Sequence, residues 1–189
     1  MKISLLFFAF LAPALGLPPI GKDDWFLLAS HAGEGEIQED CNMNFEEFFC
    51  ATTQDGASDS GTHVVIQECT FDDVGGWRIE KARGQSGFLL KLGSTYEEPL
   101  CMQAGDGDRQ ARVRVRPCDS DHPLQRWVWD DYTSSCGDDR GAKIKLESNT
   151  DLCLTWFGAS GVDEGEVRRV IIKPCGELHR ERAKGWWAA

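Results

Sequence analysis

Apolar residues along this chain form short runs of about 4–7 residues, separated by segments rich in Gly, Asp and Ser. In several runs apolar and polar positions alternate, as where Val113 and Val115 alternate with Arg114 and Arg116. Such alternation is typical of a strand with one face on a core and the other in water. The intervening segments, among them residues 54–61, 106–108 and 158–165, have the composition of turns. The pattern therefore predicts an all-β chain.

The runs recur with a nearly constant period. The first cysteines of three repeats lie 51 and 52 residues apart, and a second cysteine follows each of them after 19, 17 and 22 residues. A tryptophan then follows after 8, 9 and 11 residues. The three sets are Cys50, Cys69 and Trp77; Cys101, Cys118 and Trp127; and Cys153, Cys175 and Trp186. Three landmarks kept in order over three copies indicate a repeated structural unit.

Each repeat also has an apolar run ahead of its first cysteine, in residues 25–29, 88–92 and 142–146. With this run counted, we expect three units of four strands, and the chain begins with the strand that elsewhere ends a unit. The repeats cover about residues 25–82, 86–131 and 142–187. Twelve short strands separated by turns favour a closed all-β fold.

With these landmarks the chain resembles the ricin B-type lectin domain, whose repeats have Leu-Cys, a second cysteine and then Gln-x-Trp. The middle repeat has all of these features, in Leu100-Cys101, Cys118 and Gln125-x-Trp127. Gly75 and Lys184 stand where the other repeats would have glutamine. The resemblance implies a β-trefoil with pseudo-three-fold symmetry, a six-stranded barrel capped by three hairpins. It also implies that Trp77, Trp127 and Trp186 are structural core residues; sugar stacking by these rings is the functional alternative.

The eight cysteines favour an oxidising compartment. The repeat suggests three disulfides, Cys50–Cys69, Cys101–Cys118 and Cys153–Cys175. Cys41 and Cys136 lie outside the repeat pattern, and we expect them to pair with each other. Two free thiols or an intermolecular bridge are the alternatives.

The first 16 residues have the features of a secretory signal peptide. Lys2 supplies the positive charge, residues 3–14 are apolar, and Ala14 and Gly16 are the small residues ahead of a cut before Leu17. An uncleaved anchor is the alternative. Residues 17–24 form a proline-containing lead, and residues 25–189 form the repeat domain. We therefore expect a protein that is secreted or enters the secretory pathway and has no stable membrane span after signal removal.

The connection over residues 31–49 is longer than its counterparts in the other repeats. Ile37, Cys41, Phe45 and Phe48 or Phe49 recur there at helical spacing with acidic residues between them, which predicts a short helical insertion. Its apolar side would cover the domain as a flap held by Cys41, or alternatively bind a partner.

The formal net charge of −11 disfavours nucleic acid and anionic membrane surfaces as partners. The four histidines have no metal-ligand spacing with the cysteines, and Asp106 and Asp108 alone supply too few oxygens for calcium. We therefore expect no metal and no cofactor. The Gly-Gln-Ser-Gly sequence of residues 84–87 is not a nucleophile elbow, and no nucleophile–base set stands out, so we expect no enzyme activity.

In ricin B-type domains the sugar site of a repeat uses an Asp two residues after the first cysteine and an aromatic residue at the end of the second strand. Polar residues ahead of the tryptophan complete it. In this chain the Asp position holds Thr52, Gln103 and Thr155, and the aromatic position holds Gln67, Arg116 and Lys173. The resemblance therefore implies a lectin-like protein whose usual sugar contacts are largely absent.

The best remaining polar cluster for a carbohydrate is Gln103, Asp106 and Gln125. Trp156 and Phe157 are the aromatic residues without an assigned role, and we expect them to be partly core. A glycan or glycoprotein is then the expected partner of a monomeric protein. The alternative is a trefoil scaffold that binds no sugar and contacts a protein, as an inhibitor or effector does.

Three arginines form a basic row in this acidic chain. Arg112, Arg114 and Arg116 alternate with Val113 and Val115, so a strand would place the arginines on one face. Such a row could bind a sulfated or carboxylated glycan. The structural alternative is a solvated strand face balanced by nearby acidic residues, Asp119, Asp121 and Asp130.

Overall fold

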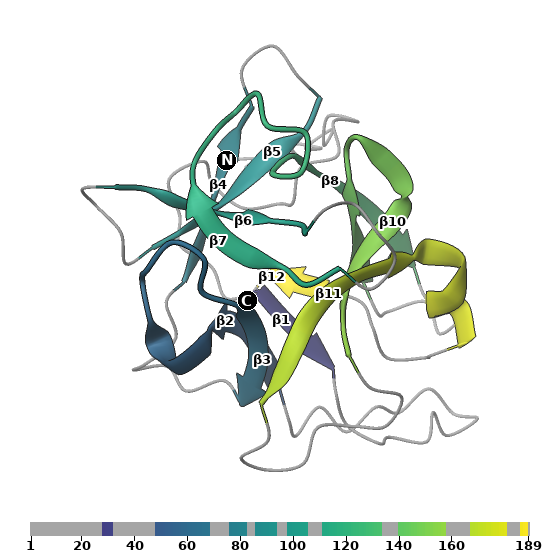
Figure 1. The fold of residues 1–189 in the computed structure, drawn as a ribbon. Helices are drawn as coiled ribbons and strands as arrows, with labels where there is room; N and C mark the ends of the chain where they lie inside the picture. The colour runs from purple at the N-terminus through teal and green to yellow at the C-terminus, as the bar shows by residue number, and fades with distance from the viewer. Residues whose placement is uncertain are drawn as a thin grey trace, which may run out of the picture.

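The computed structural model describes residues 28–31, 48–68, 76–82, 86–93, 98–105, 111–133, 140–157, 167–180 and 186–188. This part of the chain is all-β and consists of twelve strands and two short 3-10 helices (Figure 1). The strands are β1 (Leu28–His31), β2 (Phe48–Thr53), β3 (Val64–Glu68), β4 (Trp77–Lys81), β5 (Phe88–Leu92), β6 (Leu100–Gln103), β7 (Arg114–Pro117), β8 (Trp127–Thr133), β9 (Arg140–Leu146), β10 (Asn149–Trp156), β11 (Arg168–Pro174) and β12 (Trp186–Ala188). The helices are η1 (Gln54–Gly56) and η2 (Cys175–Arg180).

The twelve strands form one antiparallel sheet, with the order β10-β11-β3-β2-β1-β12-β9-β8-β5-β6-β7 and β4 paired with β5. An additional pairing of β9 with β10 joins two strands of this path and closes part of it into a ring. The first strand, β1, pairs with the last, β12. The all-β prediction is confirmed, and the sheet is barrel-like because strands far apart in the sequence close it.

Three hairpins of the sheet are built alike: β2 with β3, β6 with β7, and β10 with β11. The first cysteine of each repeat lies in the first strand of its hairpin, at Cys50, Cys101 and Cys153. Disulfides join Cys101 to Cys118 and Cys153 to Cys175, as the repeat predicted, with Cα–Cα distances of 4.9 and 5.0 Å. Each bridge ties the first strand of a hairpin to the residue that follows the second strand.

The inward positions of the hairpins form one core. Val64 and Ile66, Val113 and Val115, and Val170 and Ile172 all belong to it. Trp77, Trp127 and Trp186 are wholly buried in the same core. Each indole N–H donates to the carbonyl of the residue after a first cysteine, namely Ala51 at 2.8 Å, Met102 at 3.1 Å and Leu154 at 2.9 Å. The predicted structural role of these tryptophans is confirmed by their burial.

The hairpins converge at their inner ends, where β3, β7 and β11 approach one another (Figure 1). Val64 N–H donates to the Val113 carbonyl at 3.0 Å, and Val113 N–H donates to the Val170 carbonyl at 3.0 Å. Backbone bridges also pair His63 with Arg114 and Arg112 with Ile171. We call this meeting point of residues 61–65, 111–115 and 168–172 the hairpin junction.

A carboxylate connects the ends of three other strands. Glu147 follows β9 and accepts hydrogen bonds from Ser86 Oγ at 2.7 Å, from Gly87 N–H at 2.9 Å and from Arg126 Nε. Burial raises the pKa of Glu147, but the hydrogen bonds from Ser86 and Arg126, the Arg126 charge and the Gly87 bond outweigh it, so the pKa lies below its usual value. The carboxylate therefore stabilises the fold in its ionised form.

Several predictions concern residues outside the described part of the chain. They are the signal peptide and lead in residues 1–24, the helical insertion over residues 32–47, the pairing of Cys41 with Cys136, and Cys69 as the partner of Cys50. Cys50 itself is disulfide-bonded. The predicted helical spacing does not extend to Phe48 or Phe49, because both lie in β2 and pair there with β1.

Candidate functional site

The outer face of the middle hairpin brings together residues from both predicted sites. Val113 and Val115 point into the core, so Arg112, Arg114 and Arg116 lie on the opposite face of their segment. In the register of the hairpin Gln103 pairs with Arg114, and Cys101 pairs with Arg116. Side chains that are directly opposite in an antiparallel pair lie on the same face, with Cβ atoms about 4.5–5.5 Å apart. The carbohydrate candidate Gln103 is therefore the direct neighbour of the anion candidate Arg114.

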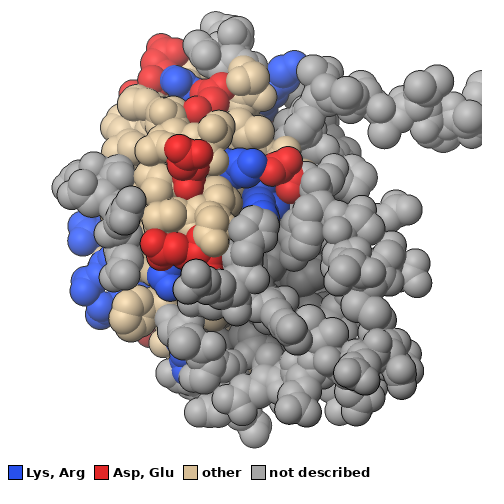
Figure 2. Space-filling view, turned by 90° about the vertical axis from the view of Figure 1, so that its right-hand side faces the viewer, with Lys and Arg blue, Asp and Glu red and all other residues tan. Residues whose placement is uncertain are grey.

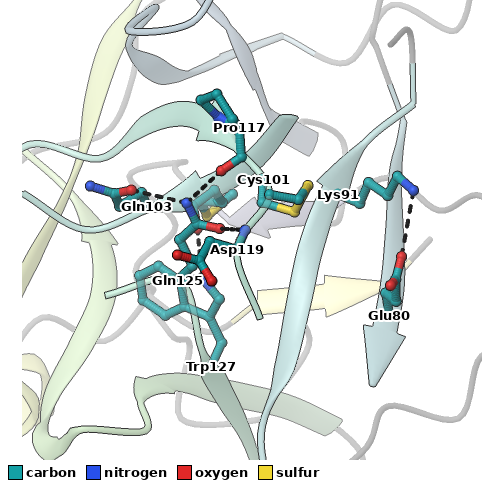
Figure 3. The surroundings of a disulfide bond; sticks show 10 residues. Glu80, Lys91, Cys101, Gln103, Pro117, Asp119, Gln125 and Trp127 are labelled. Carbon is teal, nitrogen blue, oxygen red and sulfur yellow. Dashed lines mark hydrogen bonds and ion pairs between the residues drawn. A yellow bond between two sulfur atoms is a disulfide. The ribbon is translucent and has the colours of Figure 1, made fainter. Parts of the chain in front are cut away.

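Gln103 is held in place by Gln125 (Figure 3). Gln125 Nε2 donates to Gln103 Oε1 at 3.0 Å and to the Pro117 carbonyl at 2.9 Å, while Gln125 Oε1 accepts from Asp119 N–H at 2.9 Å. Figure 3 shows the Gln103 amide nitrogen at the far end of its side chain, directed away from Gln125. The Gln103 side chain is thus oriented by Gln125.

Gln125 itself has a different role from the one expected. Its side chain is only 1% exposed, and its two donors and its oxygen are occupied by the hairpin and by Asp119. It therefore positions Gln103 and fixes the segment after the Cys101–Cys118 disulfide, rather than facing a ligand. Asp106, the third member of the predicted cluster, lies outside the described residues.

The equivalent positions of the other two hairpins are closed. Thr52 pairs with Val65, and Thr155 pairs with Ile171, where the middle hairpin has Gln103 and Arg114. All four side chains are buried. The half-buried pair Gln103–Arg114 is thus the open, polar version of this position among the three hairpins.

The hairpin junction gathers basic groups from all three repeats. His63, Arg112 and Arg169 each directly precede one of the valines that meet there. His63 and Arg114 are bridge partners, and Arg169 pairs with Val65. Burial lowers the pKa of His63, and the charges of Arg114, Arg112 and Arg169 lower it further. A hydrogen bond with the Val113 backbone raises this pKa by a smaller amount. The three guanidinium charges therefore disfavour the protonation of His63.

Sequence reasoning did not identify Arg169 or His63 as site residues. The signal was present, because both occupy the same place in their repeats as Arg112, one residue before Val64, Val113 and Val170. Figure 2 shows a group of basic side chains along its left edge, while most of the acidic side chains on that face lie nearer its middle and top. Positive charge is thus locally concentrated in a chain with a net charge of −11.

Arg116, the last of the predicted arginine row, has a different contact from Arg112 and Arg114. Its guanidinium lies against Gly61, where a Cβ atom would be 3.2 Å from Arg116 Nη1. Gly61 has a φ of +100°, which glycine adopts readily and other residues do not. Arg116 is therefore packed on Gly61 at the edge of the junction, and Arg112 and Arg114 are the members of the row whose charges act on His63.

The two aromatic residues without an assigned role differ sharply. Trp156 is buried and meets Trp186 edge-on with ring centroids 6.1 Å apart. Phe157 is 60% exposed, and Val167, near it in the same hairpin, is 51% exposed. Trp156 is therefore core, whereas Phe157 is on the surface.

Within the described ranges, no group of three or more His, Cys, Asp or Glu side chains could hold a metal ion. In the same part of the chain no helix is long and apolar enough to cross a bilayer.

The fold defines the class of the protein, which is an all-β domain of one antiparallel barrel-like sheet. Comparison with known proteins shows which solved structures share this fold. No family model and no curated protein matches the chain. A chain in the crystal structure of cytolethal distending toxin from Haemophilus ducreyi matches with a TM-score of 0.60 and 15% identity over 98% of this chain and 94% of that one. A chain in the crystal structure of cytolethal distending toxin from Actinobacillus actinomycetemcomitans matches with a TM-score of 0.57 and 15% identity, over 87% of this chain and 90% of that one. At this identity the likeness establishes a shared fold and nothing more.

Proposed function

We propose that the chain is a β-trefoil of the ricin B-type and acts as a secreted, non-catalytic module that binds a carbohydrate through its middle hairpin. The trefoil is supported by the three like hairpins and by three buried tryptophans that donate to equivalent carbonyls. The two disulfides support an extracellular or secretory location. The fold shared with the two toxin chains agrees with the trefoil at the level of an all-β domain.

One observation carries the binding proposal: Gln103 occupies the place of the family's sugar-binding Asp and is fixed there by buried Gln125. A side chain that is already oriented loses little conformational freedom on binding. Its amide N–H₂ can donate to a sugar hydroxyl or ring oxygen, and the neighbouring Arg114 adds charged donors. In the other hairpins Thr52 and Thr155 are buried, so the middle repeat is the one that we expect to bind.

A glycan array tests this proposal with the purified chain and two matched variants. Gln103→Ala removes the donor, and Gln54→Ala removes an exposed glutamine from the turn of another hairpin as a control. A neutral hydrogen bond is worth about 0.5–1.5 kcal/mol, so we expect Gln103→Ala to weaken glycan binding roughly 2–12-fold. Gln54→Ala should bind as the wild type does. Silence across the array, or equal binding by the Gln103→Ala variant, would contradict the proposal.

A protein-contacting scaffold is the second candidate, and one observation favours it. Phe157 and Val167 are the large hydrophobic side chains that the described part of the chain exposes. Exposed apolar groups at a hairpin end are suited to contact with a protein surface. If the array is silent while Phe157→Ser abolishes binding to a glycan-free protein ligand, this second function replaces the first.

A further inference from the structure

Basic side chains from three different repeats surround one point on the outer face of the hairpin junction. Arg112 and Arg114 belong to the middle repeat, Arg169 to the third and His63 to the first. The backbone bridge between His63 and Arg114 and the pairing of Arg169 with Val65 bring these segments together. The cluster is therefore produced by the convergence of the hairpins and is absent from any single repeat.

None of the three arginines has an acidic partner in the part of the chain that is described. Three ion pairs between described residues, Lys91–Glu80, Arg126–Glu147 and Lys145–Asp130, lie elsewhere. Arg112 and Arg169 are exposed, and Arg114 and His63 are half-buried. Like charges placed together without a counter-ion repel one another, so an anion bound among them would relieve this repulsion.

The surroundings of the cluster strengthen its attraction for an anion. Val65 pairs with Arg169, and Ile171 pairs with Arg112 across a backbone bridge. Both apolar side chains are buried beside the arginines on the outer face. Charges next to a low-dielectric surface interact more strongly than charges in water. A guanidinium also presents several donors in a planar fork, which suits an oxyanion with three acceptor oxygens.

We propose that the hairpin junction binds a sulfate ester of a glycan, with Arg112, Arg114 and Arg169 as the anion ligands. This inference rests on the proposed function, because it specifies the class of glycan, and it extends the site from Gln103 across Arg114 to the junction. The site has contributions from all three repeats.

The expected proton uptake follows from the groups that face His63. These are Arg114 and Arg112 from the middle repeat, Arg169 from the third and the backbone of Val113. In the free protein burial and the three arginines keep the pKa of His63 low, so the imidazole is neutral near pH 7. A bound sulfate adds negative charge and raises that pKa. By linkage, sulfate binding then becomes tighter as the pH falls towards 5.5.

A glycan is favoured over other sources of a phosphate or sulfate group because the basic cluster is small. Duplex nucleic acid and anionic bilayers present extended negative surfaces, and the chain as a whole carries a net charge of −11. A short sulfated oligosaccharide presents its negative charge over a small area, as the basic cluster does. It can also contact Gln103 at the same time.

Calorimetric titration of the purified chain with a heparin-derived tetrasaccharide and with its desulfated counterpart tests the inference. We expect the sulfated form to bind roughly tenfold or more tightly than the desulfated form, because hydrogen bonds to charged groups are among the strong ones. Its affinity should rise at least roughly threefold from pH 7.5 to pH 5.5, with proton uptake measured in buffers of different ionisation enthalpy.

Three variants separate the parts of the inference. Arg112→Gln together with Arg169→Gln should remove most of the preference for the sulfated form. His63→Gln should retain sulfate binding and lose its pH dependence. Lys81→Gln, at an exposed position outside the junction, makes the same change of charge as one arginine substitution. It should leave the preference for the sulfated form and the pH dependence of binding unchanged. Thermal melts of each variant establish that it is folded.

The outcomes distinguish this inference from the proposed function. If neutral and sulfated glycans bind equally and depend on Gln103, the inference is wrong and the proposed function stands. If neither binds, both are wrong. If phosphatidylserine vesicles or duplex DNA bind as tightly as the tetrasaccharide, the glycan class is wrong. If Lys81→Gln weakens binding as much as the arginine variants do, the attraction is non-specific and the site is rejected.

Discussion

Trp127 combines a buried apolar body with a single polar group that is fully satisfied. Its ring is wholly buried, and its indole N–H donates to the Met102 carbonyl at 3.1 Å. Trp77 and Trp186 repeat this arrangement in the other units. In each unit the carbonyl that accepts this hydrogen bond belongs to the residue after the first cysteine of the repeat. The bond therefore joins the tryptophan of the repeat to the strand that contains its first cysteine. The tryptophans therefore hold each hairpin to the core through shape and through one hydrogen bond.

Substitution of Trp127 tests this role. Trp127→Ala should lower the free energy of unfolding by about 3–5 kcal/mol, because it leaves a cavity in the core. Trp127→Phe should cost less, since it keeps much of the apolar body and loses the donor to Met102. Urea titration measures both. Phe157→Ala, at a side chain that is 60% exposed, is the control and should change stability by no more than about 0.5 kcal/mol. Equal effects of Trp127→Ala and Phe157→Ala would contradict the structural role.

At the scale of the element, Glu147 connects strand ends that are distant in the sequence. It accepts from Ser86 and Gly87 ahead of β5 and from Arg126 ahead of β8, while it follows β9 itself. The side chains of Glu147 and Arg126 are only 13% and 15% exposed, so the pair is shielded from solvent far more than a surface ion pair is. These contacts set the spacing of the strands that support the middle hairpin.

Glu147→Gln should destabilise the protein in a pH-dependent way. The folded-state pKa of Glu147 is lowered, so the carboxylate contributes stability above its unfolded pKa of about 4.3, and this contribution is lost as the pH falls through the lower folded pKa. We expect a loss of about 1–3 kcal/mol at pH 7 that becomes smaller as the pH falls towards 3. Glu80→Gln, at the more exposed pair with Lys91, should lose at most about 1 kcal/mol at either pH. Urea titrations at the two pH values decide this. A deficit of Glu147→Gln that persists unchanged at pH 3 would rule out the ionised carboxylate as its cause.

The sequence predicted those features that depend on local pattern. Alternation and turn composition predicted the strands, and the repeat predicted the bridges Cys101–Cys118 and Cys153–Cys175, because each pairs positions within one hairpin. The adjacency of Gln103 and Arg114 could not be predicted, since a shift of one residue in hairpin register changes every cross-strand neighbour. The polar type of Gln125 likewise suggested a surface ligand contact, whereas three hydrogen bonds to the hairpin and to Asp119 allow it to be buried.

At the scale of the whole molecule, three similar hairpins meet and yet differ in what they expose. The outer position is closed by Thr52 and Val65 in one hairpin and by Thr155 and Ile171 in another, while the middle hairpin has Gln103 and Arg114. The junction then adds Arg169 and His63 from the neighbouring repeats, which no reading of one repeat could supply. The repeated landmarks account for the fold, whereas the candidate site lies at positions where the three repeats have different residues.

An NMR titration that observes glutamine side-chain amides, arginine Nε–H groups, valine methyl groups and phenylalanine rings tests the central claim most directly. With the heparin-derived tetrasaccharide as ligand, the account predicts that the signals of Gln103, Arg112 and Arg114 shift together and saturably, while the methyl groups of Val167 and the ring of Phe157 stay unchanged. Shifts confined to Phe157 and Val167, or spread evenly over the surface, would contradict a binding face on the middle hairpin.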